Sequence, residues 1–178
     1  AKNTALITIL HTFGKDLKFN PHLHIIAANG FFDRNFEFHQ SNINFDRKFS
    51  KIWRFEVLKR LNIFDFNRYK YGFYAWSDKK PLSNNKNLKK YVCRYVRHPA
   101  IANSRISGYC KNKIKFIYLD NGVKVEIVKS VNDFITSLIQ HIPPEQFKMI
   151  RYYGIYSKTK INTSHRCHQN ISLQHSII

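Results

Sequence analysis

The sequence predicts an α+β fold built around a largely antiparallel sheet, and two kinds of pattern support this prediction. Asn29-Gly30 and Asn121-Gly122 each follow an apolar run, and this dipeptide is typical of tight β-hairpins. Longer segments repeat their apolar residues at the spacing of amphipathic helices. Because hairpins join antiparallel neighbours, we expect a sheet of about five mostly antiparallel strands with helices packed on it.

The first half of the chain opens with a short apolar run that we expect to be a buried strand. A second run ends at Asn29-Gly30 and is expected to pair with a returning strand. A later helix begins at the capping residue Ser83 and stops before Pro99. In chain order, the expected elements are strands over 4–10, 22–28 and 31–39, a helix over 46–61, an aromatic strand over 69–76 and a helix over 83–97.

The second half contains the clearer hairpin, with strands over 113–119 and 123–128 joined by Asp120-Asn121-Gly122. A helix over 130–141 follows, with its apolar residues on one face, and ends before Pro143-Pro144. We expect a last strand over 147–156. The segment over 161–178 shows neither period, and it is interpreted as a tail.

The charge of the chain limits its partners. Its 178 residues include 30 Lys and Arg but only 11 Asp and Glu, for a net charge of +19. Such an excess favours a polyanion as partner, either nucleic acid or an anionic membrane surface. No apolar run approaches the roughly 20 residues that span a bilayer, so we expect a soluble, intracellular protein. Cys93, Cys110 and Cys167 support neither a disulfide framework nor a cysteine zinc site.

Two histidines are the first candidates for chemistry. His22 and His24 are two residues apart on an expected strand, so both imidazoles project from the same face. Two convergent imidazoles can hold a divalent cation. Taken alone, the pattern is weak, because it more often means two polar residues on a strand face.

Two tyrosines are the second candidates. Tyr91 and Tyr95 are four residues apart on an expected helix, which places their phenols on one face about 6 Å apart. Basic residues surround them, and a tyrosine oxygen can act as a covalent nucleophile. The simpler alternative is that both rings pack on the sheet with their hydroxyls in solvent. Together, a histidine pair, a tyrosine pair and a large positive charge are what a metal-dependent nuclease requires.

Three segments resemble the signature blocks of a known family. "HTFGKDLKFNPHLH", "YVCRYVRHPAIANSRI" and "IRYYGIYS" occur in the order found in two-tyrosine rolling-circle transposases of the HUH endonuclease superfamily. The resemblance extends from Leu10 to about Ser157. It implies an HUH catalytic domain over residues 1–157, followed by a C-terminal tail over 158–178.

The resemblance also implies an activity, a cofactor and a partner. A tyrosine would attack single-stranded DNA at the transposon ends, form a 5′-phosphotyrosine and leave a free 3′-hydroxyl, with no nucleotide cofactor. Tyr91 and Tyr95 match the nucleophiles. His22 and His24 match the ligands of Mg²⁺ or Mn²⁺. The expected location is the bacterial cytoplasm, on the nucleoid when DNA is bound.

A third metal ligand is expected near the histidine pair, because imidazole alone is not a favoured ligand of Mg²⁺. His11 is the preferred candidate, with Asp16, His39 and Gln40 as weaker ones. The alternative for His11 is a structural role at the end of its strand.

Basic and aromatic residues are candidates for DNA contact. Those expected to bind phosphate are Arg94, Arg97, His98, Arg105 and Arg151. Candidate stacking platforms for bases are Phe73, Tyr74, Trp76, Tyr152 and Tyr153. Each also has a purely structural alternative. A basic residue would be a solvated surface charge, and an aromatic ring would be part of the core.

Three other functions remain open at this stage. One is a replication initiator or relaxase with the same chemistry, and another is a catalytically silent nucleic-acid-binding module. A strongly basic ribosome-associated domain is a third, minor alternative, which would have no use for the histidines and tyrosines. Related transposases usually carry a Cys-rich zinc module before the catalytic core, and no such module is present here. We therefore expect a truncated copy or a fragment of a longer protein.

Overall fold

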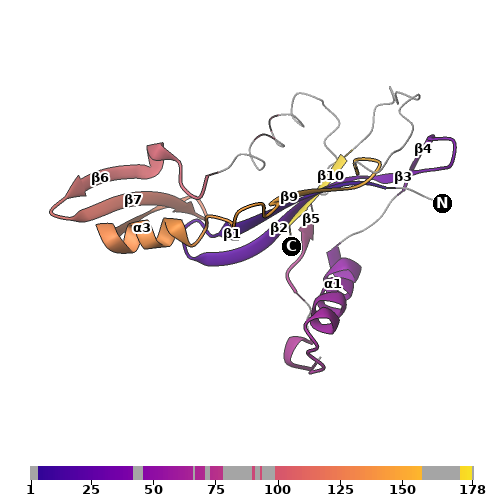
Figure 1. Cartoon of the computed structure of the whole chain (residues 1–178), viewed down its shortest axis with the longest axis horizontal. Helices are drawn as coiled ribbons and strands as arrows, with labels where there is room; N and C mark the ends of the chain where they lie inside the picture. The colour runs from indigo at the N-terminus through magenta and orange to yellow at the C-terminus, as the bar shows by residue number, and fades with distance from the viewer. Residues whose placement is uncertain are drawn as a thin grey trace.

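The computed structural model describes residues 4–41, 46–65, 67–70, 73–77, 90, 93, 99–157 and 173–177. Their fold is α+β, with antiparallel sheets and two helices in this part of the chain, which confirms the predicted class. Figure 1 shows a long central sheet with a small ribbon of strands at one end and a second sheet at the other.

The central sheet has five strands in the order β5-β10-β2-β1-β9, and every neighbouring pair is antiparallel. Its strands are β1 (Ala5–Phe13), β2 (Phe19–Ala28), β5 (Trp76–Ser77), β9 (Ile150–Gly154) and β10 (Leu173–Ile177). β1 and β2 have the longest stretch of pairing in this sheet and form a hairpin, which Figure 1 shows reaching from the centre of the molecule to the second sheet.

A bulge interrupts the β1–β2 hairpin near its tip. His11 is opposite His22 and Phe13 is opposite Phe19, so Thr12 alone faces two residues of β2. One of these two is Pro21, which has no backbone N–H for the ladder and is tolerated in a sheet at such a position. Because the bulge accommodates Pro21, β2 already begins at Phe19. The loop between β1 and β2 is therefore shorter than the turn-forming residues between Gly14 and Pro21 indicate.

Helix α1 (Asp46–Arg60) matches the predicted helix closely and packs on one face of the central sheet. Its Phe49 and Trp53 contact the cluster around Ile25 and Ala27 of β2. The opposite face carries a separate core formed by Ala5, Ile9, Ile26, Ala28 and Phe32. The alternation of side chains along β1 and β2 therefore divides the apolar residues between two layers.

The second sheet has the order β6-β7-β8, with β6 (Ile106–Cys110), β7 (Lys113–Asp120) and β8 (Val123–Ser130). Asn121 and Gly122 have φ values of 47° and 84°, as the predicted β7–β8 turn requires. Helix α3 (Val131–Ile139) begins after Ser130, whose hydroxyl accepts a hydrogen bond from the Asp133 amide. α3 packs on this second sheet, whereas the sequence had placed the helices on the central one.

The predicted hairpin at Asn29-Gly30 is wrong. β3 (Gly30–Phe32) pairs instead with β4 (Phe38–Gln40) in a two-stranded ribbon. Gly30 does not have the positive φ of a tight hairpin turn, and its Cα packs against the carbonyl of His39, where a Cβ would not fit. A returning strand also has no free edge, because β1 and β10 occupy both sides of this end of β2.

Other boundaries differ from the sequence patterns. The aromatic segment predicted as a strand begins in the short helix η1 (Asn67–Tyr69) and contributes only Trp76 to β5. β10 arises from a segment that shows no strand pattern in the sequence. A second short helix, η2 (Asn103–Arg105), precedes β6. The predicted helix over 83–97 lies outside the described residues except for Lys90 and Cys93, which are helical.

Within the described parts of the chain, no helix is both long and apolar enough to cross a membrane.

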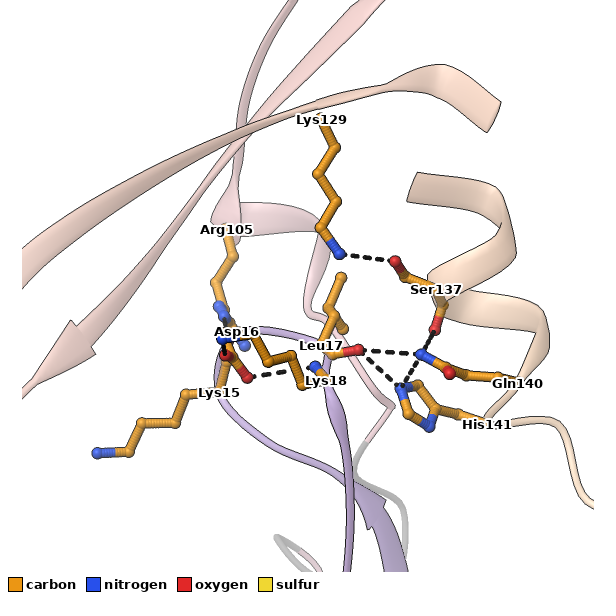
Figure 2. A network of polar contacts seen from close by, with 9 residues as sticks. All are labelled: Lys15, Asp16, Leu17, Lys18, Arg105, Lys129, Ser137, Gln140 and His141. Atoms are coloured by element: carbon orange, nitrogen blue, oxygen red, sulfur yellow. Dashed lines mark hydrogen bonds and ion pairs between the residues drawn. The ribbon is translucent and has the colours of Figure 1, made fainter. Parts of the chain in front are cut away.

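The tip of the β1–β2 hairpin is buried in the core of the second sheet. Leu17 is 0 % exposed and contacts Ile101, Phe116 and Phe134, although it lies in the turn and has a φ of 64°. Arg105, Gln140 and His141 donate hydrogen bonds to backbone carbonyls of the same turn, as Figure 2 shows. One hairpin thus belongs to two cores.

Replacing Leu17 with alanine should lower the free energy of unfolding by about 2–5 kcal/mol, because it leaves a cavity between the turn and the second sheet. The measurement is urea unfolding followed by circular dichroism. Leu119→Ala is the matched control, since Leu119 is 60 % exposed and its loss should change stability by less than about 0.5 kcal/mol. Equal effects of the two substitutions would contradict the packing of the turn.

Candidate metal centre

Three histidines converge at the bulged end of the hairpin. His11 comes from β1 and His22 and His24 from β2, and their ligand nitrogens all lie within 4.8 Å of one another. His11 pairs with His22, and His24 pairs with Ile9, so all three imidazoles project from the same face of the sheet. The structure brings His11 to the predicted pair, as expected for a third ligand.

The rings are close but not stacked on one another. The centroid of His11 is 5.6 Å from that of His22 and 4.6 Å from that of His24, with interplanar angles of 86° and 60°. The His22 and His24 centroids are 5.0 Å apart. Three rings turned steeply relative to one another can direct their lone pairs toward a common point, which is the arrangement a metal ion needs.

The bulge also orients one ligand. His22 Nδ1 lies 2.7 Å from the carbonyl oxygen of Asn20, which is in the bulged segment. A carbonyl only accepts hydrogen bonds, so Nδ1 is the protonated nitrogen and Nε2 keeps the lone pair for a metal. A hydrogen bond of this kind to the second ring nitrogen is the usual support for a histidine ligand.

Two of the three histidines of the triad are buried. His11 and His24 are 7 % and 5 % exposed, whereas His22 is half-buried. The ring of Phe13 stacks on His11 at 5.1 Å between centroids. A metal ion here would be reached from the His22 side, and its charge would be screened less than at the surface.

A fourth histidine, which the sequence analysis overlooked, connects the second sheet to the hairpin. His141 is 9 % exposed, and its Nε2 donates to the Leu17 carbonyl at 3.1 Å (Figure 2). Its Nδ1 lies 3.2 Å from the Thr12 hydroxyl, and its ring contacts that of Phe13. Because Thr12 adjoins His11 in the chain, His141 braces the strand that carries this ligand. No sequence spacing connects residues so distant in the chain.

The donor set fits a transition-metal ion better than Mg²⁺. Imidazole suits Mn²⁺ and the later first-row metals, whereas Mg²⁺ prefers hard oxygen ligands and bound water. Two of the three weaker candidates for a third ligand have other partners, since Asp16 pairs with Lys18 at 2.9 Å and His39 pairs with Asp33 at 2.9 Å.

A second group with metal-ligand chemistry lies on the β3–β4 ribbon. Asp33, Glu37 and His39 also bring their ligand atoms within 4.8 Å of one another, but Glu37 and His39 are exposed. The hydrogen bond from His39 lowers the pKa of the Asp33 carboxyl, and Asp33 also accepts from the amides of Asn35 and Glu37. These contacts of Asp33 stabilise the turn between β3 and β4, and they explain the cluster without a metal ion.

The predicted phosphate contacts are not all brought to the histidines. Arg105 donates to the carbonyls of Ile117 and Lys15, and burial lowers the pKa of its guanidinium. Arg151 pairs with Thr8 and therefore lies on the opposite face of the sheet from the triad, beside a hollow of about 390 Å³. The predicted residues Tyr91, Tyr95, Arg94, Arg97 and His98 lie outside the described residues.

Comparison with known proteins identifies the family. A family model described as "Putative transposase" (Y2_Tnp) matches residues 5–63 and 70–164. That match covers most of the chain and includes the whole hairpin with its three histidines. The chain belongs to the Y2 transposase family.

Two curated relatives are similar over much of this chain. The transposase for insertion sequence element IS801 from Pseudomonas savastanoi pv. phaseolicola is 27 % identical over 171 residues, covering 82 % of this chain and 41 % of the relative. A protein named "Putative transposase y4qJ", from Sinorhizobium fredii (strain NBRC 101917 / NGR234), is 27 % identical over 176 residues, covering 82 % and 44 %. The chain thus spans less than half the length of each. No solved structure matches.

Replacing His11 with alanine should weaken Mn²⁺ binding by at least about tenfold, because it removes one of three convergent ligands. Isothermal titration of the metal-free chain with Mn²⁺ measures the change. His39→Ala is the control, since it removes a histidine from the ribbon cluster and leaves the triad intact. If His39→Ala abolished binding and His11→Ala did not, the metal would belong to the ribbon.

Proposed function

We propose that this chain is the catalytic core of a transposase that cuts and rejoins single-stranded DNA at the ends of an insertion sequence. The observation that carries the proposal is the triad of imidazoles on two paired strands, in a chain of the Y2 transposase family. The net charge of +19 supports a polyanionic substrate.

His11, His22 and His24 are the residues that would hold a divalent cation, either Mn²⁺ or Mg²⁺. When bound, such an ion polarises a phosphoryl oxygen of the DNA and stabilises the charge that develops there. The hairpin contributes rigidity, since the Asn20 carbonyl orients His22 and His141, which follows α3, bonds to Thr12 next to His11. Pre-set ligands avoid the cost of arranging them at the moment of reaction.

Tyr91 and Tyr95 are the proposed nucleophiles. The phenolic oxygen of one attacks phosphorus, its proton is lost, and a 5′-phosphotyrosine bond forms. The bond from phosphorus to the 3′-oxygen breaks, and that oxygen takes up a proton to become a free 3′-hydroxyl. A second tyrosine can hold another strand in the same way. The energy of the phosphodiester is thus conserved through strand transfer, without a nucleotide cofactor.

The proposed phosphate contacts are of two kinds. Arg94, Arg97 and His98 adjoin the tyrosines in the chain and are proposed to bind the phosphates next to the cleaved one. Arg105 and Arg151 are proposed as weaker contributors, because Arg105 already donates to backbone carbonyls and Arg151 lies on the other face of the sheet.

The test is covalent capture of DNA. Labelled single strands from the ends of the element's own DNA should form a protein–DNA adduct with Mn²⁺ and none without it. Mass spectrometry should place the adduct on Tyr91 or Tyr95. Replacing both with phenylalanine should remove it, because phenylalanine has no nucleophilic oxygen.

Tyr109→Phe is the matched control, since Tyr109 is an exposed tyrosine on β6 and its change should leave the adduct unaltered. Binding of the same strands with no adduct under any metal would refute the catalytic proposal and leave a nucleic-acid-binding module. An adduct formed only at a plasmid origin would instead indicate a replication initiator or relaxase.

A further inference from the structure

A pocket of about 630 Å³ adjoins the histidine triad at the edge of β2. Asn20 and His22 line it from the hairpin, and Trp53, Phe73 and Tyr74 line it from the side of α1 and the segment before β5. His22 therefore belongs both to the candidate metal centre and to the wall of this pocket. Leu10 and Leu23, which face α1, also line the pocket, so it lies on the α1 side of the sheet and meets the triad at His22.

The pocket lies beside the part of β2 that is nearest the hairpin tip. Among the described residues, the pairing of β10 with β2 runs from Ala28 to His24. Toward the hairpin tip, this edge of β2 continues with Asn20 and Pro21 in the pocket wall. The pocket is thus lined by polar residues of β2 and by several aromatic residues.

The aromatic wall is held in place by α1. The Ser50 hydroxyl donates to the carbonyl of Phe73, and Arg54 Nη1 donates to the carbonyl of Tyr69 at 2.5 Å. The rings of Tyr69 and Phe73 meet edge to face at 5.6 Å. A wall fixed in this way is pre-formed, which lowers the entropy cost of binding a flat ligand.

We propose that this pocket binds one unpaired base of single-stranded DNA, the base that lies beside the phosphate at the triad. The inference rests on the proposed function, which brings a single strand to these histidines. Flat aromatic rings stack on any base through its π-face, and this contact suits a strand without a partner. Asn20 and His22 also line the pocket and add polar groups to its wall.

Tyr74 is the residue that best reports on the pocket. Its side chain is 74 % exposed although it is aromatic and lines an apolar hollow, so a stacked base would cover a surface that is now in water. Its removal should leave the fold intact. Tyr109 is 69 % exposed on β6 of the second sheet and provides a matched control.

The experiment compares two probes of equal charge, a thymidine 20-mer and a 20-mer whose sugars carry no bases, without metal so that no cleavage occurs. The unaltered chain should prefer the thymidine strand. Tyr74→Ala should weaken binding of that strand by about 5- to 100-fold, the effect of losing a stacked base, and should not change binding of the abasic strand. Tyr109→Ala should change neither affinity.

Photo-crosslinking locates the base directly. A thymidine 20-mer with one 5-iodouracil should crosslink to the peptide containing Phe73 and Tyr74, or to Trp53. The proposal is overturned if Tyr74→Ala and Tyr109→Ala have equal effects, or if crosslinks form only on aromatic residues of the second sheet. The result is separable from the proposed function. A covalent adduct on Tyr91 or Tyr95 with no base preference refutes the pocket alone, and a base preference without any adduct refutes the nuclease alone.

Discussion

The antiparallel pairing of β1 with β2 is the constraint on which the candidate site depends. It places His11 opposite His22 and Ile9 opposite His24, so that three imidazoles share one face while Leu23 and Ile25 face α1. A slip of one residue between the strands would move one set of side chains to the other face. That slip would also expose the core around Ile25 and Ala27, so the packing of α1 protects the register of the histidines.

The tip of the same hairpin is held by a second, independent core. Leu17 is enclosed by residues of the β6–β8 sheet and α3, and Arg105 and His141 donate to the carbonyls of its turn (Figure 2). The hairpin is thus fixed at both ends, with the bulge and the triad between them. His141, which is remote from the three histidines in the chain, therefore supports the strand of His11 through its bond to Thr12.

Local patterns in the sequence predict only those features that depend on residues near one another in the chain. The spacing of two residues places His22 and His24 on one face, and Asn121-Gly122 defines a hairpin because both residues have the required positive φ. Asn29-Gly30 is the same dipeptide but does not form the predicted hairpin turn. β10 and β1 already occupy both edges of β2, and Gly30 packs against β4. His11 lies opposite His22 because the regular β1–β2 register continues to this pair, and no periodicity within one strand reveals which residue of another strand lies opposite. His141 and β10 join the hairpin through contacts distant in the chain, so neither follows from local sequence.

The candidate metal ligands and the aromatic residues of the pocket lie on opposite faces of the central sheet, and the two groups meet at the edge of β2. The histidines occupy one face, while α1, Arg151 and the aromatic residues around Trp53 belong to the other. Of the three histidines of the triad, His22 also lines the pocket on the α1 side. A single strand bound across this edge can present a phosphate to the imidazoles and a base to the aromatic wall at once. A base-paired strand cannot do so, since its bases are held in the stack. Under this proposal, the pocket beside His22 would favour single-stranded DNA, because an unpaired base is free to enter it.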